Sequence, residues 1–104
     1  MELKLTGRHF EVTRGIKEHV ELKANKLPKF YSSVESIETI IDGGEGKTTK
    51  VEVITKGGHN PPLVVKVQGE EDDNLFKIID EAFEKAERQL KKIKEKERNP
   101  MHAG

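Results

Sequence analysis

Basic side chains crowd the last part of the chain, in a stretch whose residue types suit the binding of phosphate groups. Residues 86–98 read AERQLKKIKEKER, and together with Lys85 the stretch holds seven bases among three acids. Lysine and arginine bind phosphates through charge-assisted hydrogen bonds. The whole chain has 19 basic and 19 acidic residues, so attraction for a polyanion must come from a local patch. Such a run is also typical of a solvated helix face, and the sequence leaves both interpretations open.

The bases fall into two rows when the sequence is placed on helices of 3.6 residues per turn. Each row follows one flank of an apolar stripe, and the stripes run from Ile16 to Leu27 and from Leu75 to Ile93. The second helix carries Lys85, Arg88, Lys92 and Lys96; the first carries His19, Lys23 and Lys26, with Lys29 just beyond it. We expect both rows to border one groove between the helices, with the acidic residues placed elsewhere.

The elements that position these rows follow from apolar periodicity. Strands are predicted over residues 2–6, 34–42, 48–56 and 63–68, where residues alternate or are rich in β-branched types. Thr13 predicts the N-cap of the first helix, Pro28 predicts its end near Leu27, and Asp72-Asp73 predict an N-cap for the second helix.

This order of elements predicts an α+β fold. We expect a two-layer β-α-β-β-β-α sandwich, in which a mainly antiparallel four-stranded sheet carries both helices on one face. The face under the helices should carry Leu3, Leu5, Val51, Val53, Val65 and Val67. We expect one domain over residues 1–98 and a disordered tail over residues 99–104.

No residue pattern points to an enzyme, a cofactor or a metal site. His9, His19, His59 and His102 are scattered, and the chain has no cysteine to complete a zinc site. The glycine-rich residues 43–47 lack the Gly-Lys-Ser/Thr ending of a phosphate-binding loop and predict a hairpin turn. No apolar run reaches the roughly 18 residues that a membrane span needs. We therefore expect a cytoplasmic protein with no membrane contact and no small-molecule substrate.

Two separated segments resemble the ribosome hibernation promoting factor and ribosome-associated translation inhibitor family. They are LTGRHFEVTRGIKEHVELKANKLPKF and LFKIIDEAFEKAERQLKKIKEK, and the resemblance extends from about residue 1 to residue 98. It implies a fold similar to that of double-stranded-RNA-binding domains. It also implies a protein that binds small-subunit rRNA in the mRNA and tRNA channel and inhibits translation under stress or in stationary phase.

The resemblance implies that basic residues of both helices contact the rRNA. Carried over one at a time, these are Lys17, Lys23, Lys26, Lys29, Lys85, Arg88, Lys91, Lys92, Lys94 and Lys96. Asn74, Phe76 and Pro28 depart from the family pattern, so we expect the helix starts to be capped differently, but none of the three lies in the basic rows. Long members of the family pair two ribosomes through a further C-terminal domain, so we expect this chain to be a monomer off the ribosome.

Two other functions stay open. A generic double-stranded-RNA-binding module shares this architecture, but it normally carries bases at the start of its last helix, where this chain has Glu70 to Asp73. The second open function is a protein-interaction domain that uses the polar face of the sheet. Phe30 and Tyr31 could stack on bases, but we expect them to cover the end of the core. His19 is expected to be an exposed helix residue rather than an RNA contact.

Overall fold

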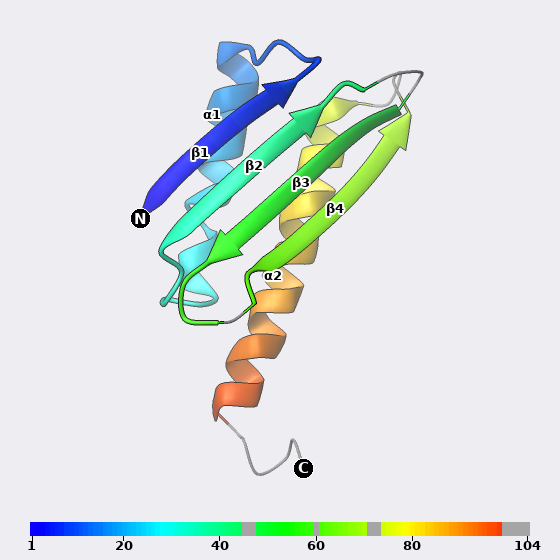
Figure 1. The fold of residues 1–104 in the computed structure, drawn as a ribbon. Coiled ribbons are helices and arrows are strands. Elements are labelled where there is room, and N and C mark those ends of the chain that lie inside the picture. Colours follow the sequence, from blue (N-terminus) through cyan, green and yellow to red (C-terminus); the bar gives the residue numbers. More distant parts are fainter. Residues whose placement is uncertain (45–47, 60, 71–73, 99–104) are drawn as a thin grey trace.

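The computed structural model describes residues 1–44, 48–59, 61–70 and 74–98. The described residues form four strands, two α-helices and one short 3-10 helix, in the order shown in Figure 1. The elements are β1 (Glu2–Arg8), α1 (Arg14–Ala24), the 3-10 helix η1 (Leu27–Lys29), β2 (Ser36–Asp42), β3 (Thr48–Lys56), β4 (Leu63–Glu70) and α2 (Leu75–Arg98). None of the described helices is long and apolar enough to cross a membrane.

The strands form one mixed sheet in the order β1-β2-β3-β4. β2 pairs antiparallel with β3, and β3 pairs antiparallel with β4. β1 pairs parallel with β2, with Leu3 opposite Ile37, because α1 returns the chain to the same end of the sheet before β2 begins. The predicted α+β fold with four strands and two helices is confirmed, and the sheet that was expected to be mainly antiparallel is mixed.

Local side-chain chemistry sets the bounds of α1. The predicted N-cap is confirmed, because the Thr13 hydroxyl accepts a hydrogen bond from the Ile16 N–H at 3.3 Å. The helix ends at Ala24, earlier than the predicted end near Leu27. Pro28 lies inside η1, where its missing N–H costs no helical hydrogen bond.

Asn74 caps the start of α2. Its side-chain oxygen accepts a hydrogen bond from the Phe76 N–H at 2.9 Å. The N-cap predicted at Asp72-Asp73 lies outside the described residues, as do residues 45–47 of the predicted turn and the predicted tail, residues 99–104. Glu70, which we expected to begin the acidic helix start, is the last residue of β4.

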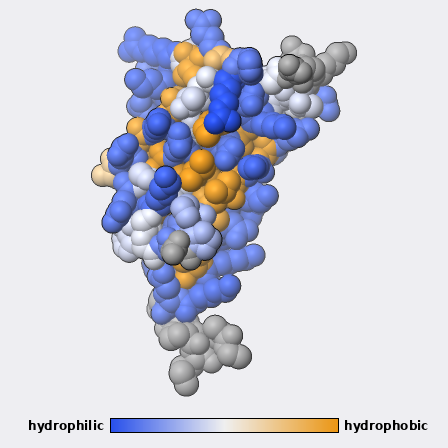
Figure 2. Space-filling view, viewed as in Figure 1, coloured by the Kyte–Doolittle hydropathy of each residue, from blue (hydrophilic) through white to orange (hydrophobic). Residues whose placement is uncertain are grey.

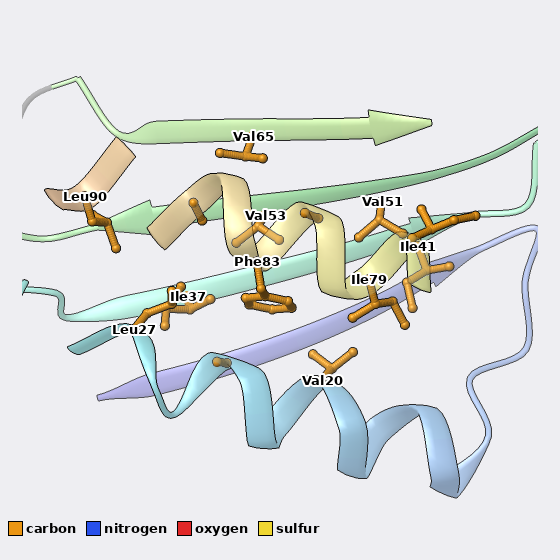
Figure 3. Packing of buried hydrophobic residues seen from close by; sticks show 14 of the residues in the cluster. Val20, Leu27, Ile37, Ile41, Val51, Val53, Val65, Ile79, Phe83 and Leu90 are labelled. Carbon is orange, nitrogen blue, oxygen red and sulfur yellow. The ribbon is translucent and has the colours of Figure 1, made fainter. Parts of the chain in front are cut away.

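Both helices pack on the same face of the sheet, as predicted, and the core lies between the two layers (Figure 1). Isoleucine and valine side chains from the sheet meet the apolar stripes of α1 and α2 there, as Figure 3 shows. Val51, Val53 and Val65 are buried, whereas Leu3, Leu5 and Val67 are half-buried at the margins of the core. Burial of these apolar surfaces is the main stabilising contribution to the fold.

The other face of the sheet has no helix over it. Charged residues alternate on it, and one contact is the ion pair between Lys4 and Glu38 at 3.8 Å. Figure 2 shows hydrophobic atoms near the middle of this face among hydrophilic side chains. Strand alternation assigns Ile40, Ile54 and Val64 to this face, and only Val64 among them is exposed. We expected a face of mixed charge, and the apolar strip was not predicted.

Candidate nucleic-acid interface

A groove separates α1 from α2, but only one of its walls is basic. The lining residues are Lys23, Lys26, Leu27 and Phe30 on the α1 side and Asp80, Phe83, Glu84 and Glu87 on α2. The three acids recur at helical spacing and therefore form one wall. The predicted groove with a basic row on both sides is wrong, because the flank of α2 that faces α1 is acidic along this part of the helix.

Asp80 ties the two helices together across this groove. Its carboxylate lies 2.6 Å from His19 Nε2 and 3.5 Å from Lys23 Nζ. The His19 ring also meets the edge of Phe76, with ring centroids 4.9 Å apart. His19 is therefore a half-buried contact between helices, whereas we expected an exposed residue. Lys23 is held by the same carboxylate, which reduces the charge that it offers to an external anion.

The row on α2 lies on the opposite flank of that helix. On a helix with 100° between successive residues, Lys85 and Lys92 lie about 140° to 160° around the axis from Glu87, on the other side of the apolar stripe. Neither they nor Arg88 line the groove, and all three side chains are exposed. We call this set the outer flank; its members are Lys85, Arg88, Lys92 and Lys96.

A second group of bases lies where η1 meets the last turns of α2. Lys91 Nζ lies over the Phe30 ring at 4.8 Å from its centroid, so residues next to Phe30 approach the C-terminal half of α2. The α2 flank that faces α1 therefore changes from acidic at Glu87 to basic at Lys91. We call this group the basic end; its members are Lys26, Lys29, Lys91 and Lys94.

The ten predicted site residues differ in their availability. Lys17 pairs with Glu21 at 4.0 Å, Lys23 pairs with Asp80, and Lys91 lies on Phe30. The other seven are exposed and form no ion pair within the described part of the chain; they are Lys26, Lys29, Lys85, Arg88, Lys92, Lys94 and Lys96. These seven charges are free to interact with an anionic partner.

Tyr31 belongs to the core, as predicted, and is only 4% exposed. Phe30 was expected to cover the end of the core as well, but it is half-buried and lines the groove between the helices. The Tyr31 hydroxyl lies 2.7 Å from Glu97 Oε1 and 2.6 Å from the Gly58 carbonyl oxygen. The hydrogen bond to Glu97 is the main cause that raises the pKa of Tyr31 to about 12, and burial and the charge of Glu97 raise it further.

Glu97 is a residue that our sequence reasoning missed. Its position could have revealed it, because Glu97 follows Leu90 and Ile93 at helical spacing and so continues the apolar stripe of α2. A carboxylate at a stripe position indicates a polar partner on the facing element, and here that partner is Tyr31.

Known proteins resemble this chain over almost its full length. A ribosome hibernation promoting factor of Pseudomonas putida is 25% identical over 99 residues, which cover 95% of this chain and 92% of that protein. The factor of the same name in Escherichia coli K12 is 28% identical over 102 residues, covering 92% and 96%. The Bacillus subtilis ribosome hibernation promotion factor is 31% identical over 99 residues, covering 92% of this chain and 50% of that protein.

Solved structures share the fold. A ribosomal subunit interface protein from Coxiella burnetii superposes with a TM-score of 0.78 at 20% identity, covering 90% of this chain and 98% of that one. The N-terminal domain of Thermus thermophilus Protein Y gives a TM-score of 0.74 at 26% identity, covering 89% and 99%. The family described as Sigma 54 modulation protein / S30EA ribosomal protein matches residues 3–98. Because that match spans nearly the whole sequence, the chain belongs to this family.

Proposed function

We propose that this chain binds the rRNA of the small ribosomal subunit in the channel used by mRNA and tRNA, and thereby inhibits translation under stress or in stationary phase. Its family and relatives named ribosome hibernation promoting factors support a ribosome-associated role. The observation that carries the rRNA proposal is the set of seven exposed bases without an ion-pair partner among the described residues.

The geometry favours binding along the outer flank and the basic end rather than inside the groove. Phosphates are repelled by the acidic wall of Asp80, Glu84 and Glu87. Bases on the outer flank follow one side of α2, a helix of 24 residues, and such a row suits successive phosphates of an RNA backbone. Each phosphate that a base neutralises releases counterions, so a chain of zero net charge can still bind RNA through these surfaces.

The test is a charge reversal on the outer flank. We expect the triple variant Arg88→Glu, Lys92→Glu, Lys96→Glu to lose binding to purified small subunits and to lose inhibition of translation in a cell-free system. In any residual binding, the log–log slope of affinity against salt should flatten by about 2 to 3, because each lost phosphate contact removes about 0.7 to 0.9. The thermal midpoint should change little, since exposed charges contribute little to stability.

A matched control makes the same change in net charge on the far side of the molecule. The variant Lys50→Glu, Lys56→Glu, Lys66→Glu places its reversals on the uncovered face of the sheet, where all three lysines are exposed. It should bind nearly as the wild type does. Equal loss of binding in both triple variants, or none in the outer-flank variant, would refute the site assignment. Equal affinity for any RNA duplex would favour the generic RNA-binding module.

A further inference from the structure

We propose that the hydrogen bond between Tyr31 and Glu97 acts as a clasp that orders the last turns of α2. The ordered turns then position Lys91 and Lys94 of the basic end and Lys96 of the outer flank for RNA. The proposal rests on the proposed function for the identity of the ligand. Tyr31 acts through other residues and touches no RNA itself, so it is a positioning residue. The clasp joins two residues that are 66 positions apart in the sequence.

The last turns of α2 need such support. Figure 1 shows that α2 continues past the ends of the strands, so its final part has no sheet beneath it. Leu90 is the last fully buried residue of the helix, and Ile93 is half-buried. Helix ends fray when tertiary contacts do not hold them. Beyond Ile93, the hydrogen bond from Tyr31 to Glu97 is the one side-chain hydrogen bond or ion pair that joins the described part of α2 to the rest of the molecule.

Tyr31 is itself held firmly from the sheet side. Its hydroxyl has one proton, which is shared between two acceptors: Glu97 Oε1 at 2.7 Å and the carbonyl oxygen of Gly58, in the turn after β3, at 2.6 Å. Gly58 has a φ of +74°, and a Cβ at this position would lie 2.8 Å from the Tyr31 hydroxyl and 2.4 Å from Ser33 Cβ. Only glycine at position 58 therefore leaves room for the Tyr31 side chain beside this turn, and the Tyr31 side chain is buried. A fixed ring gives the helix end a fixed anchor.

The side chains next to the clasp are the proposed RNA contacts. Lys94 and Lys96 lie within the turn that precedes Glu97, and Lys91 lies over Phe30, the residue before Tyr31. If these turns fray, the bases occupy many positions, and only the ordered fraction of molecules is ready to bind. The apparent dissociation constant rises in inverse proportion to that fraction. The clasp therefore raises affinity without contributing a phosphate contact of its own.

The charge of Glu97 makes the proposal testable, because electrostatics and the clasp predict opposite changes in RNA affinity when Glu97 is removed. Glu97 is a negative charge among lysines, so its removal should tighten RNA binding if electrostatics alone act. The clasp predicts the opposite for Glu97→Ala. The matched control is Glu95→Ala, which removes the same charge two residues away; both glutamates are exposed, but only Glu97 forms a described hydrogen bond to Tyr31. We expect Glu97→Ala to bind small subunits about five- to tenfold more weakly than Glu95→Ala, the size of one lost hydrogen bond of ordinary net strength.

Two further variants separate ordering from other effects. Tyr31→Phe keeps the ring and all charges but removes the donor, so it should bind about five- to tenfold more weakly than the wild type, which is its charge-matched reference. Glu97→Gln keeps an acceptor oxygen for the hydroxyl, so it should restore binding to the level of Glu95→Ala. Amide hydrogen exchange over residues 94–98 should become about tenfold faster in Glu97→Ala and Tyr31→Phe, and it should stay at the wild-type rate in Glu95→Ala.

The outcomes distinguish the two proposals. If wild-type protein does not bind small subunits, the proposed function fails, and hydrogen exchange still decides whether the clasp orders the helix end. Unchanged exchange in both clasp variants would overturn the clasp. Faster exchange, with Glu97→Ala binding subunits as tightly as Glu95→Ala and Tyr31→Phe binding them as tightly as the wild type, would overturn its positioning role.

Discussion

At the scale of single residues, Tyr31 links local chemistry to the stability of the fold. It is the one tyrosine of a chain that has no tryptophan, so its ionisation can be followed without interference. Its hydroxyl donates to a carboxylate, which stabilises the protonated form, and its burial disfavours the charged phenolate. Both causes act in the same direction and raise its pKa to about 12.

We expect absorbance titration of the phenolate to give a midpoint near pH 12 in the folded protein. In Glu97→Ala the midpoint should move back toward the usual tyrosine value of about 10, because both the hydrogen bond and the negative charge are lost. Glu95→Ala is the control and should keep the wild-type midpoint. A wild-type midpoint near 10 would contradict the described contact.

The pKa of Tyr31 is about 12 in the folded protein and about 10, the usual tyrosine value, in the unfolded chain. This difference predicts how the stability of the fold depends on pH. Below about pH 10 the tyrosine is protonated in both the folded and unfolded states, so its contribution to stability is fully present. As the pH rises from about 10 to 12, the unfolded chain loses this proton first, and the free energy of unfolding falls. Denaturant titrations of wild type and Tyr31→Phe across this range should show the steeper fall in the wild type.

At the scale of elements, Phe83 contributes to two interfaces of α2. It is 3% exposed, belongs to the core cluster and lines the groove toward α1, as its place between the helices and the sheet in Figure 3 shows. Asp80, one turn earlier in the same helix, adds polar contacts with His19 and Lys23 of α1. The position of α2 is therefore fixed by apolar packing, while its charged flanks remain open to other partners.

Replacing Phe83 by alanine should lower the free energy of unfolding by about 3 to 5 kcal/mol, because the substitution leaves a cavity where the two layers meet. Phe76→Ala on the same helix is the control, since Phe76 is 41% exposed and should cost clearly less. Chemical denaturation followed by circular dichroism measures both values. Equal losses in the two variants would show that Phe83 does not occupy a central position in the core.

At the scale of the whole molecule, the surface separates into regions of different charge although the net charge is zero. The groove wall is acidic, the outer flank and the basic end are basic, and the uncovered face of the sheet carries charges of both signs. Zero net charge removes long-range attraction, so association with RNA should depend on these local surfaces and weaken as salt rises.

We expect the protein to be a monomer in solution. The helices already cover one face of the sheet, and the apolar strip of Ile40, Ile54 and Val64 on the other face has only one exposed side chain. A stable dimer interface needs about 800 Å² from each partner, more than this strip offers. Sedimentation velocity over a range of concentrations is the measurement, and a concentration-dependent shift to a dimer would contradict the prediction.

With ribosomes, the protein alone should not produce a ribosome-dimer peak in a sucrose gradient.

Much of this structure was determined by the sequence alone, because apolar periodicity is a local property. Alternation gave β3 its bounds at Thr48 and Lys56, and the stripe that begins at Leu75 gave α2 its start and its buried face. The positions of the bases around each helix also followed from spacing. The pairing of β1 with β2 could not be predicted from local patterns, because it depends on where α1 returns the chain to the sheet.

Only the tertiary structure decided which flank of α2 faces α1. An apolar stripe has two flanks, and the order of the strands, with the helices packed over them, determines which flank meets the neighbouring helix. For this reason Asp80, Glu84 and Glu87 line the groove, while the predicted bases Lys85, Arg88 and Lys92 face away from it. The contact between Tyr31 and Glu97 has the same origin, because the two residues approach each other only when η1 and the end of α2 pack together.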